Sequence, residues 1–196
     1  MFAGSLRRGR TTVGPTGPPR VLRPDLGTHD AVPERHEFGS NTDPLTGKAT
    51  FKVPAGAAEY TLTTSASRST KVHTASTRID ASWTFHSKRP TAGVTELPVS
   101  SVRFKAPVGL DSRVPAGRTV TYPVTVEGAA AGRNLKSLAV YVSYDDGRTW
   151  KKTDVRNGRI TVRNPAKGKG VSLRAKITDK KGNKSTISVH NAYYGK

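Results

Sequence analysis

The chain has 196 residues, 34% of them hydrophobic, with no cysteine and a formal net charge of +19. The lack of cysteine excludes disulfides, thiolate zinc sites and cysteine nucleophiles. No apolar run approaches the ~18 residues of a membrane span, so we expect no membrane insertion. Residues 1–8 have no hydrophobic h-region, and we expect no signal peptide in this sequence.

Residues 1–45 have no usable periodicity. Repeated prolines, among them Pro24, interrupt any helix or strand in this segment. We therefore expect residues 1–45 to be a disordered or poorly packed lead-in.

Residues 46–92 have alternating patterns typical of strands at 49–53, 59–64 and 76–85. In the last of these, Ile79, Ala81, Trp83 and Phe85 share one face. Three strands are few for an independent sheet. We expect a partial β-sheet segment, which is either the edge of a larger sandwich or a small sheet packed on the following domain.

Residues 93–196 contain about seven short strands at close spacing. The expected strands cover 97–104, 119–126, 135–143, 159–162, 170–177 and 185–189, with a further strand beginning at Trp150. This spacing fits an immunoglobulin- or fibronectin-like β-sandwich. No amphipathic helix of twelve residues is evident, so the predicted class is all-β.

The stretch from Ser143 to Trp150 predicts a hairpin, because Asp-Gly favours a tight turn. The side-chain oxygens of Ser143 and Asp145 can fold back onto the N–H groups of the turn. The spacing resembles the Asp-box, a hairpin motif of sialidase propellers and of many secreted β-domains that is usually structural. Its residues are Ser143, Asp145, Gly147, Thr149 and Trp150.

Asp145 and Asp146 could also form a corner of a calcium site. Arg148 lies beside them and few other acids are near in the sequence. A turn-stabilising role is therefore favoured, and we expect no metal site. The five histidines are scattered without metal-ligand spacing.

Positive charge is concentrated in the C-terminal half. Residues 148–184 contain thirteen Lys and Arg but only two acids. Such a face attracts polyanions through a salt-dependent, unspecific field, although an ordinary basic surface is the simpler explanation. The candidate polyanion-binding residues are Arg148, Lys151, Lys152, Arg156, Arg159, Arg163, Lys167 and Lys169.

Several short patterns occur in a familiar order. They are Ser76 to Phe85, Glu96-Leu97-Pro98, Val102-Arg103-Phe104, Val142 to Trp150, Val171 to Ala175, and Ala192-Tyr193. Together they resemble the C-terminal accessory β-sandwich region of secreted subtilisin-like serine peptidases of actinomycetes, over about residues 46–196. The resemblance implies an extracellular location and a peptidase catalytic domain as a partner.

No catalytic residue follows from this resemblance. The chain lacks the Gly-Thr-Ser-type context of the nucleophile and the helices of the catalytic α/β fold. We expect no enzyme activity and no cofactor, and a non-catalytic accessory module with a structural or interaction role.

Two alternatives remain open. The first is a basic module that binds an anionic cell-wall polymer or a polysaccharide. Tyr144 is the best candidate for an exposed aromatic, Trp83 is expected in the core, and a second aligned aromatic is not evident. Unspecific nucleic-acid binding ranks last, since only the charge suggests it.

Overall fold

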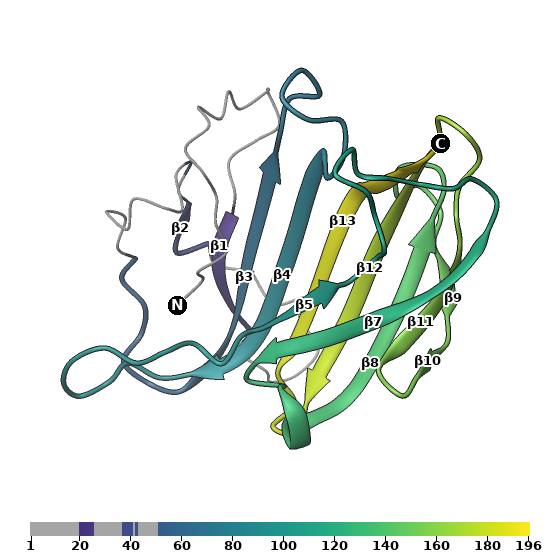
Figure 1. The fold of residues 1–196 in the computed structure, drawn as a ribbon. Coiled ribbons are helices and arrows are strands. Elements are labelled where there is room, and N and C mark those ends of the chain that lie inside the picture. The colour runs from purple at the N-terminus through teal and green to yellow at the C-terminus, as the bar shows by residue number, and fades with distance from the viewer. Residues whose placement is uncertain (1–19, 26–36, 41, 43–50) are drawn as a thin grey trace.

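The computed structural model describes residues 20–25, 37–40, 42 and 51–196, and the fold is all-β as predicted (Figure 1). Its larger sheet has the order β2 (Gly39–Ser40), β1 (Arg20–Asp25), β3 (Ala58–Ser67), β4 (Arg78–Ser87), β13 (Lys184–Gly195), β12 (Gly170–Asp179), β8 (Leu135–Ser143), β9 (Lys151–Thr153). The smaller sheet has the order β10 (Val155–Arg156), β11 (Arg159–Arg163), β7 (Thr119–Gly128), β5 (Ser100–Phe104). Neighbouring strands are antiparallel, except that the short β6 (Arg113–Val114) pairs with β13 in parallel.

The two sheets form a sandwich over β8, β12 and β13, where the smaller sheet crosses in front of the larger one (Figure 1). Alternating residues of both sheets point into the space between them, as the sequence pattern predicts. Leu173 of β12 is 1% exposed and Val140 of β8 is fully buried. The main core contains Val114, Tyr122, Val124, Val140, Val142, Ile160, Val162, Val171, Leu173 and Tyr193.

Strands β3 and β4, which we call the wing, continue the larger sheet edge to edge. β4 pairs with β13 from Lys184 opposite Thr84 to His190 opposite Arg78. The predicted strands of residues 46–92 therefore extend the sandwich sheet instead of packing on it as a second sheet. Trp83 also donates a hydrogen bond from Nε1 to the carbonyl of Ser100, 2.7 Å away, at the start of β5.

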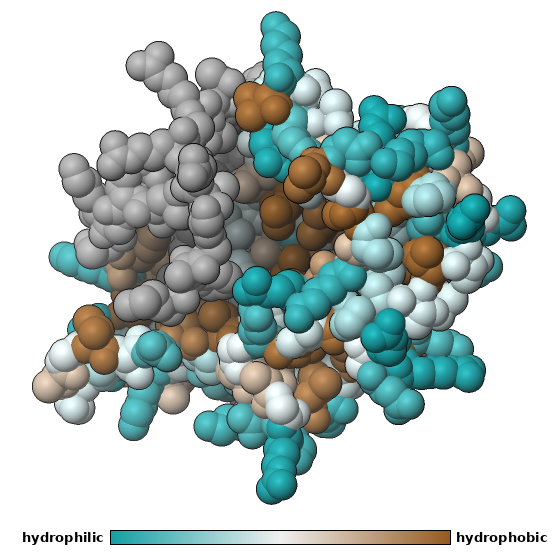
Figure 2. Space-filling view, in the orientation of Figure 1, coloured by the Kyte–Doolittle hydropathy of each residue, from teal (hydrophilic) through white to brown (hydrophobic). Residues whose placement is uncertain are grey.

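The inner face of the wing is only partly covered. Tyr60 and Phe85 are 2% and 1% exposed, whereas Ile79 at the other end of the wing is 41% exposed. Apolar residues gather in the hollow at the centre of Figure 2, where the smaller sheet does not cross the larger one. The wing thus has a more open core than the sandwich.

Two sequence predictions need correction. Phe51, Lys52 and Val53 are not in a strand, and residues 49–50 lie outside the described residues. Within the segment 1–45, where no strand was expected, residues 20–25 and 39–40 form β1 and β2. Among the described residues, only Arg20 and Val21 of β1 pair with β2, and Pro24 pairs with β3 alone. A proline without N–H is tolerated at such an edge position. Residues 37, 38 and 42 are described but are not in a strand, and the other residues of 1–45 lie outside the described part.

No helix among the described residues is long and apolar enough to cross a bilayer.

Candidate functional site

The segment Ser143–Trp150 connects β8 and β9 as a hairpin loop, and its side chains form the turn. Ser143 Oγ accepts a hydrogen bond from the N–H of Gly147 at 2.8 Å and donates one to Asp145 Oδ1 at 2.7 Å. Asp145 accepts further hydrogen bonds from the N–H of Thr149 at 2.9 Å and from its hydroxyl. The hydrogen bonds from Ser143 and Thr149 hold the pKa of Asp145 well below its usual range.

Gly147 lets this loop close onto the sheet. Its φ is +83°, in the left-handed region that favours glycine. A Cβ atom at this position would lie 2.7 Å from His190 Cε1 and 2.9 Å from Trp150 Cζ2. The loop therefore packs directly on His190, in the middle of β13.

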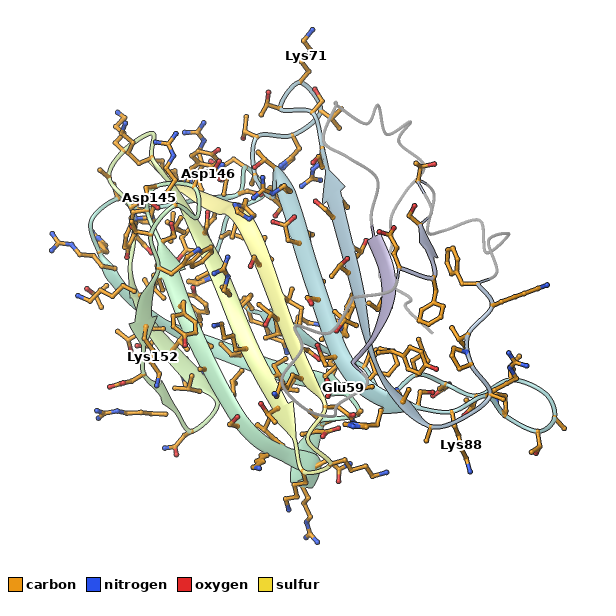
Figure 3. All side chains as sticks on the ribbon, turned by 180° about the vertical axis from the view of Figure 1, so that it is seen from behind. Glu59, Lys71, Lys88, Asp145, Asp146 and Lys152 are labelled. Atoms are coloured by element: carbon orange, nitrogen blue, oxygen red, sulfur yellow. The ribbon has the colours of Figure 1, made fainter. Side chains whose placement is uncertain are left out.

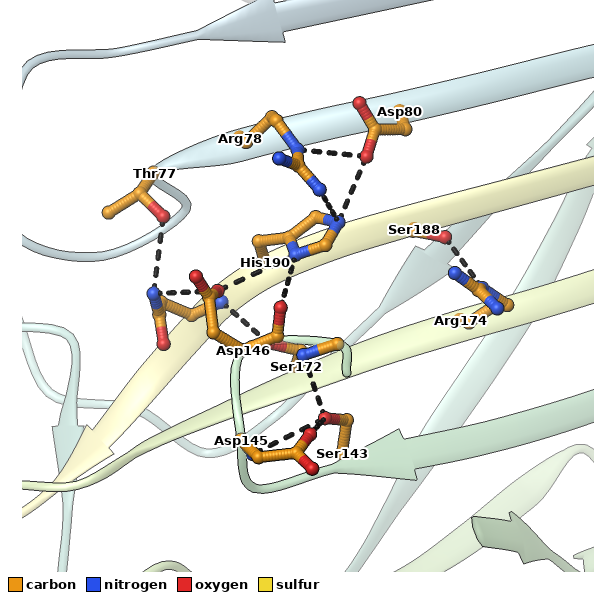
Figure 4. A network of polar contacts seen from close by, with 12 residues as sticks. Thr77, Arg78, Asp80, Ser143, Asp145, Asp146, Ser172, Arg174, Ser188 and His190 are labelled. Carbon is orange, nitrogen blue, oxygen red and sulfur yellow. Dashed lines mark hydrogen bonds and ion pairs between the residues drawn. The ribbon is translucent and has the colours of Figure 1, made fainter. Parts of the chain in front are cut away.

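His190 is the centre of a polar network that joins the wing to the sandwich (Figure 4). Its side chain is 4% exposed. Nδ1 lies 3.0 Å from the carbonyl oxygen of Asp146, and Nε2 lies 2.9 Å from Asp80 Oδ2 and 3.0 Å from Arg78 Nη2. Since a carbonyl oxygen only accepts, Nδ1 carries a hydrogen, and Nε2 either accepts from Arg78 or donates to Asp80.

The imidazole of His190 is almost fully buried and its hydrogen bonds are used within the protein. Both ring nitrogens have partners, and the 143–150 loop covers the ring. Among the described residues no serine hydroxyl hydrogen-bonds to His190, since Ser143, Ser172 and Ser188 bond elsewhere. The network has the residue types of a hydrolase site without its geometry.

Sequence reasoning missed the His190 network. Asp80 and His190 are 110 residues apart. Asp80 lies at an outward position of the predicted strand 76–85, whereas His190 directly follows the predicted strand 185–189. Their contact depends on the pairing of β4 with β13, which no local pattern specifies. The alternation of polar residues in both strands was the only feature of the sequence that pointed to a polar contact between them.

The predicted polyanion-binding residues are all exposed but do not share one face. Lys152 pairs with Tyr141 on the outer face of the larger sheet. Arg159 and Arg163 pair with β7 and point away from the core on the opposite, smaller sheet, since Ile160 and Val162 between them are buried. Lys151 and Arg156 lie at the edge between the sheets, Arg148 in the hairpin loop, and Lys167 and Lys169 in the loop before β12. The predicted basic face is thus a basic edge that wraps around the sandwich.

Figure 3 shows the outer face of the larger sheet, with Lys152 labelled on β9. An aromatic and cationic cluster lies on this face. The guanidinium carbon of Arg174 lies 4.0 Å from the centre of the Trp150 ring. Tyr141 is opposite Arg174 in the pairing of β8 with β12, and Lys176 Nζ lies 5.5 Å from the Tyr141 ring. Burial lowers the pKa of Arg174 from its usual value. The stacking of Arg174 on Trp150 was not evident from the sequence.

Tyr144, the predicted exposed aromatic, is 49% exposed, and its hydroxyl donates to the carbonyl of Arg163 at 2.6 Å. Trp83 is half-buried under the smaller sheet.

The two neighbouring aspartates of the loop already have hydrogen-bond donors. Asp145 accepts from Ser143 and Thr149, and Asp146 Oδ1 accepts from Asn191 Nδ2 at 3.0 Å. In the part of the chain that the structure describes, no three His, Cys, Asp or Glu side chains gather as ligands for a metal ion.

Comparison of the chain with protein-family models, with curated proteins and with solved structures finds no match.

Proposed function

We propose that the chain is a non-catalytic accessory β-sandwich module of a secreted subtilisin-like serine peptidase, with a structural or interaction role. The order of motifs that resembles the accessory region of these peptidases supports this role, as does the two-sheet fold. The observation that carries the proposal is that His190 is buried and hydrogen-bonded through both ring nitrogens. It is the histidine with two aspartates against it, and it is covered by a loop with both nitrogens engaged. Its partners and burial fit a structural junction.

A proteolysis assay tests this proposal. The purified full chain is incubated with casein, and we expect no cleavage above that of a His190→Gln variant. Cleavage that survives repurification, is abolished by a serine-directed phosphonate and is lost in the variant would overturn the proposal. The expected extracellular location and the expected partner, a peptidase catalytic domain, belong to the same proposal.

A second candidate function is binding of an anionic cell-wall polymer, favoured by the basic edge. Seven of the eight predicted cations there have no carboxylate partner among the described residues, since Arg156 alone pairs, with Asp154 at 3.4 Å. Because Lys152 and Arg159 lie on opposite sheets, a bound polymer would contact the edge from both sides.

Pull-down by anionic cell-wall material at increasing salt tests the second candidate. We expect retention that falls steeply with salt, because released counterions drive such binding. The double variant Arg159→Gln/Arg163→Gln should weaken retention, whereas Lys180→Gln/Lys181→Gln removes the same charge from the turn after β12 and should not. Equal loss in both variants, or retention unchanged at high salt, would exclude a site at the edge.

A further inference from the structure

The outer face of the larger sheet carries a row of polar side chains that runs from the basic edge to Asp80 of the His190 network. Strand pairing places these residues side by side across five strands. From the edge inward they are Lys152, Tyr141, Arg174, Ser188 and Asp80. We call them the outer row.

Arg174 is the residue of this row whose N–H donors are mostly without a hydrogen-bond acceptor among the described residues. Its guanidinium stacks on Trp150 at 4.0 Å, and Nε donates to Ser188 Oγ at 2.8 Å. A guanidinium has five N–H donors, so the four on Nη1 and Nη2 remain. No other described residue accepts a hydrogen bond from them. The stack and the Ser188 bond fix the plane of the group, which reduces the entropy lost when a ligand binds.

The nearby carboxylate of Asp80 does not satisfy Arg174. Asp80 Oδ1 accepts from Ser65 at 2.7 Å, and Oδ2 receives Arg78 Nε and His190 Nε2, each at 2.9 Å. Lys152 and Lys176, both exposed, add positive charge on the other side of Arg174. Asp80 attracts Arg174 electrostatically, but no hydrogen bond joins the two groups, so the Nη donors of Arg174 have no hydrogen-bond partner among the described residues.

Hydroxyl groups surround Arg174 on the outer face. In the next register position along the strands, Lys176, Thr186, Ser82 and Thr63 share the same outer face. The half-buried Tyr141 ring lies beside Arg174. Hydroxyl groups can hydrogen-bond sugar hydroxyls, and an aromatic ring offers an apolar surface with a polar tip.

We propose that this face binds a carbohydrate that carries carboxylate groups, with a uronate carboxylate on the Nη groups of Arg174 and sugar rings against Tyr141 and the hydroxyl rows. A planar guanidinium matches a carboxylate in a bidentate pair, which is stronger and more specific than a point charge. This inference deepens the second proposed function, since it rests on binding of an anionic polymer and places a specific subsite away from Arg159 and Arg163.

Titration calorimetry of the full chain with a galacturonate hexamer tests the subsite. The fully methyl-esterified hexamer serves as the neutral sugar, and polyglutamate as a carboxylate polymer without sugar. We expect binding of the hexamer and at least about tenfold weaker binding of each control ligand, because a charge-assisted bidentate pair and the sugar contacts are both required. Equal affinity for the esterified hexamer or for polyglutamate would overturn the proposal, as would no binding of the hexamer.

Variants separate geometry from charge. Arg174→Gln and Arg174→Lys should each weaken hexamer binding by about tenfold or more, since Lys keeps the charge but has no planar fork. Lys184→Gln removes a charge from the same face but outside the row, and should change affinity less than about twofold. Full affinity in Arg174→Lys would contradict the bidentate subsite.

A third measurement does not depend on a substitution. The chain has two tryptophans, so its nitrogen–proton NMR spectrum has two indole signals. The hexamer should shift the Trp150 signal and leave that of Trp83, which bonds to Ser100, in place. An unmoved Trp150 signal in the presence of bound hexamer would exclude this face. If Arg159→Gln/Arg163→Gln alone abolishes hexamer binding, the basic edge binds the polymer and the Arg174 subsite is wrong.

Discussion

The sandwich and the wing share the larger sheet but are stabilised differently. Over β8, β12 and β13 the smaller sheet closes a core in which Leu173 is 1% exposed. In the wing, Phe85 is 1% exposed at one end while Ile79 at the other end is 41% exposed. Continuous backbone pairing therefore does not by itself give a continuous core. The wing also depends on Trp83 and on the His190 network for its attachment.

The largest expected effect distinguishes the two cores directly. Leu173→Ala should lower the free energy of unfolding by about 2–5 kcal/mol, because it leaves a cavity between two sheets. Ile79→Ala, a similar truncation on the same sheet, should cost less than about 1 kcal/mol, because solvent already reaches the side chain. Urea unfolding of both variants measures the difference. Equal losses would mean that the wing is packed as tightly as the sandwich.

The next largest effect on stability is expected in the 143–150 loop, which packs on His190. Gly147→Ala should destabilise by about 1–3 kcal/mol more than Gly182→Ala, because its Cβ would overpack His190. Both glycines have positive φ, +83° and +91°, but Gly182 has open space around it. The control should cost about 1–2 kcal/mol from backbone strain alone. Thermal unfolding compares the pair, and equal shifts would show that the loop does not press on His190.

Within the sandwich, a buried tyrosine pair predicts a loss of stability in alkali. Tyr122 and Tyr193 hydroxyls lie 3.3 Å apart, and burial raises the pKa of Tyr193 to about 12 and that of Tyr122 further. The unfolded tyrosines ionise near pH 10, so the folded state binds more protons above that pH. Stability should be complete below about pH 10 and fall as the pH rises toward 12.

The variant Tyr122→Phe/Tyr193→Phe tests the pair. Its stability should depend less on pH between 9 and 11.5, measured by urea unfolding. Tyr122→Phe alone leaves the Tyr193 hydroxyl buried without this partner and should cost about 1 kcal/mol at neutral pH. An unchanged alkaline slope in the double variant would assign the loss to other groups.

The smallest effect concerns the hairpin in acid. The depressed pKa of Asp145 means that its contribution is present above the unfolded pKa of about 3.9 and is lost as the pH falls through the lower folded value. Asp145→Asn should therefore flatten the decline of stability below pH 4. Asp154→Asn, at an exposed carboxylate between β9 and β10, is the matched control. A slope that Asp154→Asn changes as much as Asp145→Asn would contradict the role of the loop hydrogen bonds.

Local chemistry predicted the hairpin and most strands. Alternation identified β3, β4, β5, β7, β8, β11, β12 and β13, and the spacing of Ser143, Asp145 and Gly147 indicated the turn. Short strands such as β6 and β10 have two residues each, which is too few for an alternating pattern to be recognised in the sequence.

Long-range pairing was not predictable from the sequence in the same way. Arg174 looked like one of thirteen cations in a basic stretch, and its contact with Trp150 arises because β8 lies between β9 and β12. The division of the basic residues between two sheets has the same origin. Charge can be counted along a chain, but its distribution over faces depends on strand order.

The central position of β13 has a consequence for the order of folding. Its partner β12 is joined to it by a short turn, whereas its other partner, β4, was synthesised about a hundred residues earlier, as the 110-residue separation of Asp80 and His190 indicates. Contacts so distant in sequence form slowly, because a long loop must close first. During synthesis the β3–β4 hairpin therefore forms while Trp83 still lacks its contacts with the later strands. The nascent wing is the part of the chain for which a chaperone or rapid translation of the following strands would matter most.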